Sequence, residues 1–213
     1  MDLNEFLFLL KGLEWTLALT AIGFAGGAVA GLAIALGRTS GHRVLRRATA
    51  GYIALFQGTP LLMQLFVVYY GLALGGLKLD AWVAVAIGFT LHASAFLGEI
   101  WRGSIEAVPR GQTEAARALN LGYIPRMQKI ILPQALRISL PATVGFLVQL
   151  LKGTSLAAIV GFTELARAGS IVSNQIFKPL LVFGIVGALY FILCWPLSIW
   201  GSRLERRLAT ATR

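Results

Sequence analysis

Long stretches without a single Asp, Glu, Lys or Arg constrain this chain more than any other feature. They cover Trp15–Leu36, Ala48–Leu77, Ala81–Gly98 and Pro179–Ser202, and a fifth stretch, Ile138–Thr163, is interrupted by Lys152 alone. Of the 213 residues, 13% are charged and 57% are hydrophobic, against roughly 25% and about 45–50% in soluble domains. A spanning helix needs about 20 apolar residues, and the polar alternation of a barrel strand is missing. We therefore predict an all-α membrane protein with about five transmembrane helices.

The N-terminal segment differs from a cleavable secretory signal. Such a signal begins with positive charge, whereas Met1–Glu14 carries Asp2, Glu5 and Glu14 against Lys11 alone. Four apolar residues of the segment recur at helical spacing: Phe6, Leu9, Leu10 and Leu13. Because a helix with such a face can lie along a membrane surface, we expect this segment to be interfacial.

The basic residues are shared unevenly between the two sides of the membrane. With five spans, one side holds 14 of the 19 Lys and Arg residues, namely Arg38, Arg43, Arg46, Arg47, Arg102, Arg110, Arg117, Arg126, Lys129, Arg137, Arg203, Arg206, Arg207 and Arg213. The other side holds Lys11, Lys78, Lys152, Arg167 and Lys178. Basic residues favour cytoplasmic loops, so we expect the N-terminus outside and the C-terminus in the cytoplasm. The net charge of +10 is then mostly a topology signal, and we expect no nucleic-acid partner.

Few residues inside the predicted spans are of a type that could catalyse a reaction, bind a metal or form an ion pair. The single cysteine, Cys194, excludes an internal disulfide and a multi-cysteine metal site. His92 has no second metal donor at helical spacing, so we expect it to be hydrogen-bonded within the bundle. Glu99 and Arg102 are neighbours on one helix face near the cytoplasmic boundary. They predict a structural ion pair, with a proton relay as the alternative. We expect neither a catalytic residue nor a metal site.

Glycine and proline mark two further features of the spans. Gly23, Gly27 and Gly31 form one helix face that lets another helix approach closely, either within the chain or from a second subunit. The second stretch contains Gln57-Gly58-Thr59-Pro60, with Gln64 one turn further on. Adjacent proline and glycine disturb a helix. This motif is either the lining of a polar path or a loop at one end of the span.

The polar segment at about 103–136 is the most informative part of the sequence. Glu114 opens a short helix, and Asn120 can take the left-handed conformation that ends one. Pro125 suits the first position of a second short helix, which Pro133 disrupts. A DNA-binding helix-turn-helix has a similar pattern of two short helices, but this segment is too short and too closely tethered between spans to dock in a groove of DNA. We predict a protein-docking elbow that faces the cytoplasm.

These residues resemble the cytoplasmic signature of the membrane subunits of ATP-binding-cassette (ABC) importers. The signature is Glu-Ala-Ala, three residues, glycine, nine residues and Ile-x-Leu-Pro. The resemblance implies a type I ABC importer permease, or MetI-like, fold in a single domain over residues 1–213. It implies a short helix that docks on the ATPase subunit, and it assigns coupling to Glu114, Ala115, Ala116, Leu119, Asn120, Ile130, Leu132 and Pro133. Asn120 departs from the family's glycine, although Asn is the next most tolerant residue for a left-handed backbone.

Three other motifs narrow the resemblance to the polar amino-acid branch, which includes histidine, glutamine and arginine permeases. They are Leu55–Leu65, Ala95–Gly103 and Leu150–Leu156. Gly153 is a departure, since many relatives carry an acidic residue or Asn there. The resemblance implies a multi-pass protein of the bacterial inner membrane that moves polar or charged L-amino acids. It also implies an extracytoplasmic binding protein and a second permease subunit, identical or similar.

The chain has no nucleotide-binding motif of its own. Nothing matches G-x-x-x-x-G-K-[ST], so we expect ATP and magnesium on a separate ATPase subunit and no cofactor on this chain. The alternative is an ion-coupled secondary transporter or channel, which would favour an acidic residue deep in a span. The uncharged stretches contain none. A membrane scaffold without transport would leave the interrupted spans unexplained.

Six polar residues at the interruptions have no evident structural duty. They are Gln57, Thr59, Gln64, Lys152, Thr154 and Ser155. Polar groups that face lipid cost a few kcal/mol, and interrupted spans are a pointer to a midplane site. We therefore predict that these residues line the amino-acid path, with Lys152 near the outer gate. The alternative is that Lys152 extends to the outer interface as an ordinary amphipathic side chain.

Overall fold

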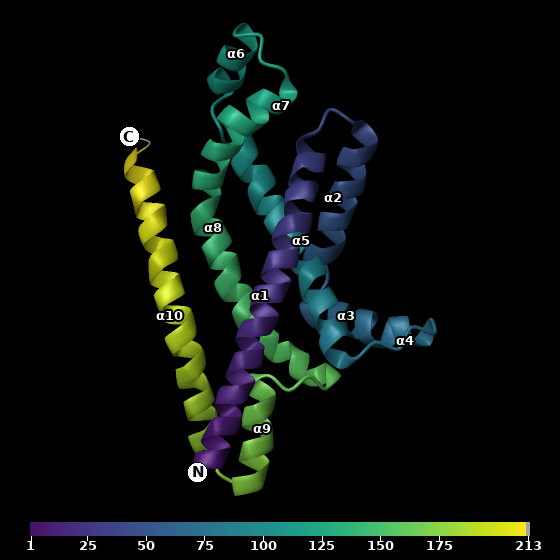
Figure 1. The fold of residues 1–213 in the computed structure, drawn as a ribbon, viewed down its shortest axis with the longest axis vertical. Coiled ribbons are helices and arrows are strands. Elements are labelled where there is room, and N and C mark those ends of the chain that lie inside the picture. Colours follow the sequence, from purple (N-terminus) through teal and green to yellow (C-terminus); the bar gives the residue numbers. More distant parts are fainter. Residues whose placement is uncertain (212–213) are drawn as a thin grey trace.

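The computed structural model consists of helices and short connections (Figure 1). It describes the backbone of residues 1–211 and the side chains of residues 1–208, so Arg213 lies outside the described part. The α-helices are α1 (Leu3–Thr39), α2 (Arg43–Gln57), α3 (Leu61–Phe66), α4 (Leu72–Leu74), α5 (Ala81–Glu106), α6 (Arg110–Ala118), α7 (Tyr123–Arg126), α8 (Leu132–Gly153), α9 (Leu165–Ile176) and α10 (Pro179–Ala211). Two π-helical turns, η1 (Val67–Gly71) and η2 (Met127–Ile131), and a 3₁₀ helix, η3 (Thr154–Val160), complete the chain. The predicted all-α class is confirmed.

Five crossings of a membrane can be assigned by length and hydropathy. Four come from α1, α5, the helical run Tyr123–Val160 and the part of α10 up to Leu208. The fifth requires α2 and the run Leu61–Leu74 to count as one span, which is bent by 105° at the Gly58–Pro60 break. The fourth span is not interrupted at Lys152, because α8 continues to Gly153 and only then tightens into η3.

The glycine face of α1 packs inside the chain, against α5. A Cβ atom at Gly23 would lie 2.8 Å from the Cβ of Phe89, and one at Gly31 would lie 3.1 Å from the backbone nitrogen of Gly98. These separations leave no room for a side chain, so glycine is what lets the two backbones come together. Of the two possibilities that the sequence leaves open, packing within the chain accounts for this face.

The expectation that the N-terminal segment lies along the membrane surface is wrong. Residues from Leu3 onward belong to the same continuous helix as the first span. The apolar face of the segment is covered by protein, since Leu9 is fully buried in a cluster with Leu165 of α9 and Val182 of α10. A Cβ at Gly12 would lie 2.9 Å from the Cβ of Ala168, so α9 sits directly on this part of α1. Because neighbouring helices satisfy the apolar face, it does not need a membrane surface.

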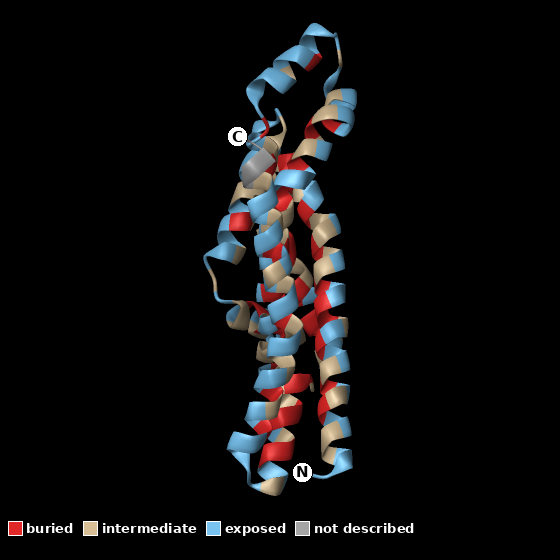
Figure 2. Cartoon of the chain, turned by 90° about the vertical axis from the view of Figure 1, so that its left-hand side faces the viewer, coloured by how far each residue is buried: buried red, intermediate tan, exposed pale blue. Residues whose placement is uncertain are grey.

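The elbow and the α9 turn occupy opposite ends of an elongated bundle (Figure 1). Buried residues face inward along the bundle, whereas its outer sides are exposed (Figure 2). The central cluster includes Phe89, Leu97, Phe146 and Leu150. α10 contributes little to it, as only 17% of its most apolar window is buried. A helix this apolar and this exposed is suited to lipid or to a further protein subunit.

Candidate functional site

Two helices form the elbow and meet at a residue in the left-handed conformation. α6 ends at Ala118, and Asn120 follows with φ of 56°. The Asn120 N–H donates to the Arg117 carbonyl at 2.8 Å, and the Leu121 N–H donates to the Ala116 carbonyl at 3.0 Å. These bonds satisfy carbonyls that the end of α6 would otherwise leave free. Asn120 therefore adopts the backbone conformation that the sequence predicts.

The tip of the elbow exposes apolar side chains beyond the bundle. Leu119 is 74% exposed and Ile124 is 64% exposed. Glu114 and Ala115 are also exposed, whereas Ala116 is buried at 1%. Ala116 therefore turns toward the chain, whereas Ala115 and Leu119, which directly follows α6, are exposed. Exposed large apolar residues on a polar, protruding segment are typical of a protein-docking surface.

A small apolar cluster fixes the base of the elbow to the spans. It consists of Val108, Met127, Ile131 and Ala135, with Ile130 and Leu132 packed against it. The expectation that Pro133 disrupts the second helix is wrong. Pro133 is the second residue of α8, and the helix continues through it. The π-helical turn η2 precedes it, and the helical run continues from Tyr123 into the fourth span.

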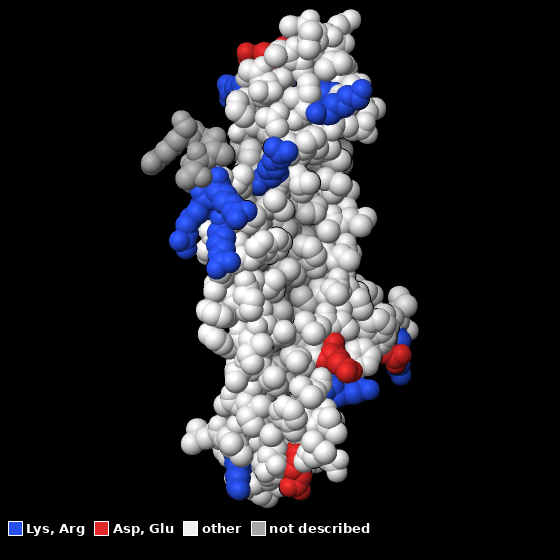
Figure 3. All heavy atoms as spheres, turned by 60° about the vertical axis from the view of Figure 1, so that its left-hand side comes forward, with Lys and Arg blue, Asp and Glu red and all other residues white. Residues whose placement is uncertain are grey.

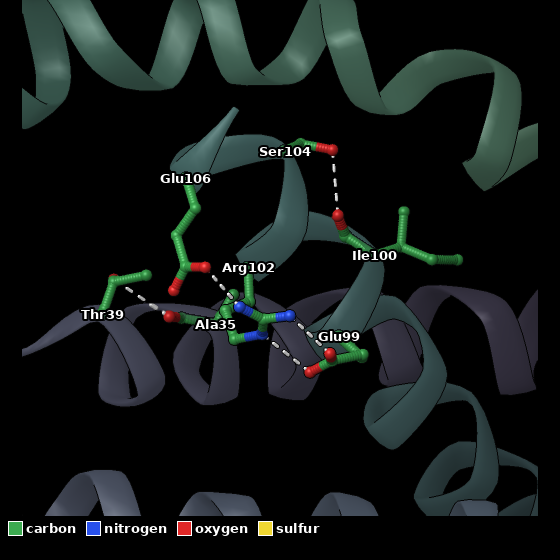
Figure 4. A network of polar contacts seen from close by, with 7 residues as sticks. All are labelled: Ala35, Thr39, Glu99, Ile100, Arg102, Ser104 and Glu106. Carbon is green, nitrogen blue, oxygen red and sulfur yellow. Dashed lines mark hydrogen bonds and ion pairs between the residues drawn. The ribbon is translucent and has the colours of Figure 1, made fainter. Parts of the chain in front are cut away.

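Glu99 and Arg102 form an ion pair at the elbow end of α5 (Figure 4). The Arg102 guanidinium donates to both Glu99 carboxylate oxygens, at 2.6 and 2.8 Å, and to Glu106 Oε2 at 2.5 Å. All three residues lie within two turns of one helix, next to the end of α1. Each nitrogen of the guanidinium donates to a carboxylate oxygen, which is an arrangement suited to a structural role.

Gln64 makes most of its hydrogen bonds across the break in the second span. Its Nε2 atom donates to the Phe56 carbonyl at 2.7 Å and to the Thr59 carbonyl at 3.0 Å, and lies 3.0 Å from Thr59 Oγ1. Its Oε1 atom lies 2.9 Å from Nδ1 of His92 on α5. The Thr59 hydroxyl donates to the Leu55 carbonyl at 2.7 Å. The interpretation of Thr59 and Gln64 as polar groups without a structural duty is therefore wrong.

The polar residues that follow α8 also have structural bonds. The Thr154 hydroxyl is fully buried and donates to the Leu151 carbonyl at 2.7 Å, and the Ser155 hydroxyl donates to the Lys152 carbonyl at 2.9 Å. Lys152 is exposed and lines a groove of about 280 Å³ between α8 and α10, together with Tyr190 and Cys194. Within residues 1–208, no hydrogen bond is recorded for the side chain of either Lys152 or Gln57.

The bend of the second span meets the end of α8 in the structure. A Cβ at Gly153, where α8 passes into η3, would lie 3.2 Å from Leu61 at the start of α3 and 3.8 Å from Phe89 of α5. The glycine therefore lets the end of α8 lie against the bend of the second span. The sequence motifs around Gln57 and Lys152 are far apart in the chain, and the fold brings them to one level of the bundle.

A buried carboxylate that the sequence analysis missed lies near the same level. Glu164 is 0% exposed and precedes α9, where its carboxylate accepts the backbone N–H groups of Ala166 and Arg167, both at 2.8 Å. The Tyr190 hydroxyl of α10 donates to it at 2.9 Å. Burial raises the pKa of the Glu164 carboxyl, against the opposite effect of these hydrogen bonds. The signal in the sequence was an acidic residue at the start of a helix, directly after an uncharged stretch.

No group of three metal-ligating side chains comes together among the residues whose placement is described. An apolar groove of about 420 Å³ lies between α1, α5 and α8, lined by Leu32, Trp101 and Pro133 among others. The groove is open at the surface of this single chain and has few polar groups. It is therefore not suited to hold a polar solute by itself.

The chain matches a known protein family over most of its length. The family model is described as binding-protein-dependent transport system inner membrane component, and it matches residues 16–210. The chain belongs to this family. It is therefore a multi-pass membrane component of a transport system that works with a binding protein.

Curated relatives extend the similarity to nearly the full length. A probable amino-acid ABC transporter permease protein, YckA of Bacillus subtilis, is 34% identical over 209 residues, which is 98% of this chain and 92% of that protein. The L-cystine transport system permease protein TcyB of the same organism is 36% identical over 198 residues, which is 92% of this chain and 85% of that protein. Both are permease proteins of transport systems.

Solved structures share the fold. A chain from the crystal structure of an amino acid ABC transporter with histidines superposes with a TM-score of 0.87 at 32% identity, covering 97% of this chain and 99% of that one. A chain of the MetNI methionine ABC transporter, in an inward-facing conformation, superposes with a TM-score of 0.82 at 23% identity, again over 97% and 99%. The predicted MetI-like permease fold is thereby confirmed.

Proposed function

We propose that this permease imports polar or charged L-amino acids, together with a second permease subunit that is identical or similar to it. The chain is a permease component of an ABC importer, in which a separate ATPase subunit hydrolyses ATP. The amino-acid assignment is supported by the names of its relatives, an amino-acid permease and a cystine permease. ATP and magnesium belong to the ATPase, and an extracytoplasmic binding protein delivers the amino acid. The system resides in a bacterial inner membrane.

The exposed elbow is the observation that carries the proposed work with a separate ATPase subunit. We propose that Glu114, Ala115, Leu119 and Asn120 contact the ATPase subunit. These residues are supported from beneath by Ala116, Ile130, Leu132 and Pro133. Leu119 is a large apolar side chain on a protruding tip, and 74% of it is exposed to water in this single chain. Docking of a partner would remove this apolar surface from water.

Charge reversal on α6 tests the coupling role. Glu114→Lys should lower transport and substrate-stimulated ATP turnover at least tenfold, because a cation replaces an anion on the docking surface, while membrane insertion is unchanged. The matched control is Glu205→Lys, which reverses an exposed acidic residue on α10 and should leave both rates within about twofold. Normal transport by Glu114→Lys would make the segment a connector and would refute the docking role.

We also propose that the elbow end of the bundle faces the cytoplasm. Basic side chains gather at the elbow and C-terminal end, and a belt without charged side chains separates them from mixed charges near the other end (Figure 3). Basic loops favour the cytoplasmic side. In a Cys194→Ala background, cysteines at Leu77 and Arg207 should react with an impermeant thiol reagent from opposite faces of the membrane. Reaction of both from the same face would contradict this topology.

The substrate path is proposed to pass the level where the bend of the second span meets the end of α8. Gln57 and Lys152 are the candidates for contact with the amino acid, because both side chains are exposed and have no recorded hydrogen bond within residues 1–208. Thr59, Gln64, Thr154 and Ser155 shape the wall of the path through their bonds to the backbone. A second permease subunit would close the exposed side.

A further inference from the structure

By its length, α2 is too short to carry the bend of the second span across the hydrocarbon layer of a membrane. α2 has 15 residues from Arg43 to Gln57, so it is about 22 Å long, shorter than the hydrocarbon core of about 30 Å. The chain then turns by 105° into the run Leu61–Leu74, which leaves the bundle sideways (Figure 1). Carbonyls released by such a break find no water in the bilayer core and each costs several kcal/mol unless it is bonded within the protein.

Gln64 supplies the bonds that the break removes. Pro60 has no N–H to continue the helix, so carbonyls at the end of α2 lose their partners. The Gln64 amide donates to the Phe56 carbonyl at 2.7 Å and to the Thr59 carbonyl at 3.0 Å. One side chain from α3 thereby closes a bond back to α2 across the turn. The angle between the two helices depends on that side chain staying in place.

His92 holds Gln64 in place from α5. Because both donors of the Gln64 amide point to α2 and the turn, its Oε1 atom accepts, and His92 Nδ1 carries the proton at 2.9 Å. The ring of His92 is only 6% exposed and lies against Phe96, with centroids 4.5 Å apart, and near Phe146 of α8. The position of the imidazole is therefore set by packing between the third and fourth spans.

We propose that Gln64 and His92 are a positioning pair that sets the angle of the bent span, and that Gln64 contributes to transport in this way and not by touching the amino acid. The inference rests on the proposed transport function and adds a mechanical element to it. Leu61, at the start of the bent-out run, lies against Gly153 at the end of α8. A change in the bend would therefore displace the wall that the second and fourth spans form.

Distance measurements on the full transporter test this pair. Spin labels at Leu74, which ends α4 and is 91% exposed, and at Val29 of α1, which is 78% exposed, report the angle of the bent run in a Cys194→Ala background. The reference pair is Val29 and Leu180, which does not involve this run. Gln64→Met keeps the side-chain length but cannot hydrogen-bond. His92→Leu removes the donor, and His92→Asn retains an N–H close to the Nδ1 position.

The expected result is a narrow Leu74–Val29 distribution in the parent protein and in His92→Asn, and a broad or shifted one in Gln64→Met and His92→Leu. The reference distance should be unchanged in all four proteins. Maximal transport should fall at least tenfold in the two disrupted variants and stay within about threefold in His92→Asn, with amino-acid preference unaltered. Unchanged distances in Gln64→Met and His92→Leu, or a changed amino-acid preference without a change in distance, would overturn the proposal. If the parent protein itself failed to transport amino acids, the proposed function would fail while the distances still tested the pair.

Discussion

The α1–α5 crossing and the bend between α2 and α3 are held by different kinds of interaction. The crossing is nearly apolar and depends on glycines, among them Gly23 and Gly31, that bring two straight helices into backbone contact. The bend depends on a few hydrogen bonds centred on Gln64. Close packing resists any change of shape, because even one added methylene is felt. A bend held by a few side-chain hydrogen bonds changes its angle when one of those side chains moves. The crossing is therefore suited to be the fixed part of the molecule, and the bend to be the adjustable one.

The largest effect is expected where the crossing is tightest. Gly27→Val should destabilise the protein by about 3 kcal/mol, at the upper end of overpacking costs, because any Cβ at Gly27 collides with Ala93 and lies 3.1 Å from the backbone nitrogen of Ser94. The control is Gly145→Val on α8, where a Cβ has open space around it. Thermal unfolding in detergent measures the difference. Equal melting temperatures for the two variants would show that the crossing is not rigid.

The α9 end of the bundle combines both kinds of interaction and allows a pH test. Gly12 packs closely on α9, while the Glu164 carboxylate accepts hydrogen bonds from α9 and α10. Burial raises the pKa of Glu164 above its ordinary value of 4.5, so the folded protein binds this proton more tightly than the unfolded chain does. The stability from this group is fully present below the unfolded pKa and is lost as the pH rises through the folded pKa.

Glu164→Gln should remove this part of the pH dependence, because an amide does not titrate. Melting temperatures of the parent protein should fall more steeply than those of the variant as the pH is raised from about 4 toward neutrality. Glu14→Gln, an exposed change on α1, serves as the control and should follow the parent protein. A parent protein whose stability rises over this interval relative to Glu164→Gln would mean that the hydrogen bonds outweigh burial.

The smallest effect is expected where the bend of the second span touches the end of α8. Gly153→Ala places a methyl group 3.2 Å from Leu61 Cδ2, the end of a side chain that can turn away, so the cost should be about 0.5 kcal/mol or less. Transport should nevertheless change more than stability does, because the displaced side chain begins the bent-out run. Comparing transport rate with melting temperature for this one variant measures how closely the bend is linked to the path. If neither the transport rate nor the melting temperature changed, the bend would not be linked to the substrate path.

The sequence was sufficient for those parts of the fold that depend on charge and backbone chemistry. Uncharged stretches located the spans because the bilayer excludes charge, and Asn120 marked the elbow because few residues accept a positive φ. The N-terminal segment was misassigned because its apolar face fits a membrane surface and a helix neighbour equally well. Only tertiary structure decides between these, and here α9 covers Leu9.

The candidate site was predicted less completely than the fold. Gln64 and Thr154 were recognised as polar residues at interruptions, but their partners are set by three-dimensional proximity. His92 lies 28 positions from Gln64 in the chain, and no periodicity connects the two. Glu164 was overlooked because an acidic residue just outside an uncharged stretch is ordinarily solvated, whereas the fold places α1, α9 and α10 around it.

The π-helical turn at Met127–Ile131 has a consequence for the direction in which the elbow points. A π turn holds one residue more than the α-helical turn that it replaces, and each residue of an α-helix advances by about 100°. The wider turn takes up this extra residue, so the residues that precede it are displaced by one position along the helix relative to an uninterrupted α-helix. Deleting a single residue from this turn would leave a continuous α-helix but would change the angle at which the elbow meets the fourth span. The length of one helical turn thereby sets the azimuth at which this subunit meets whatever docks on its elbow.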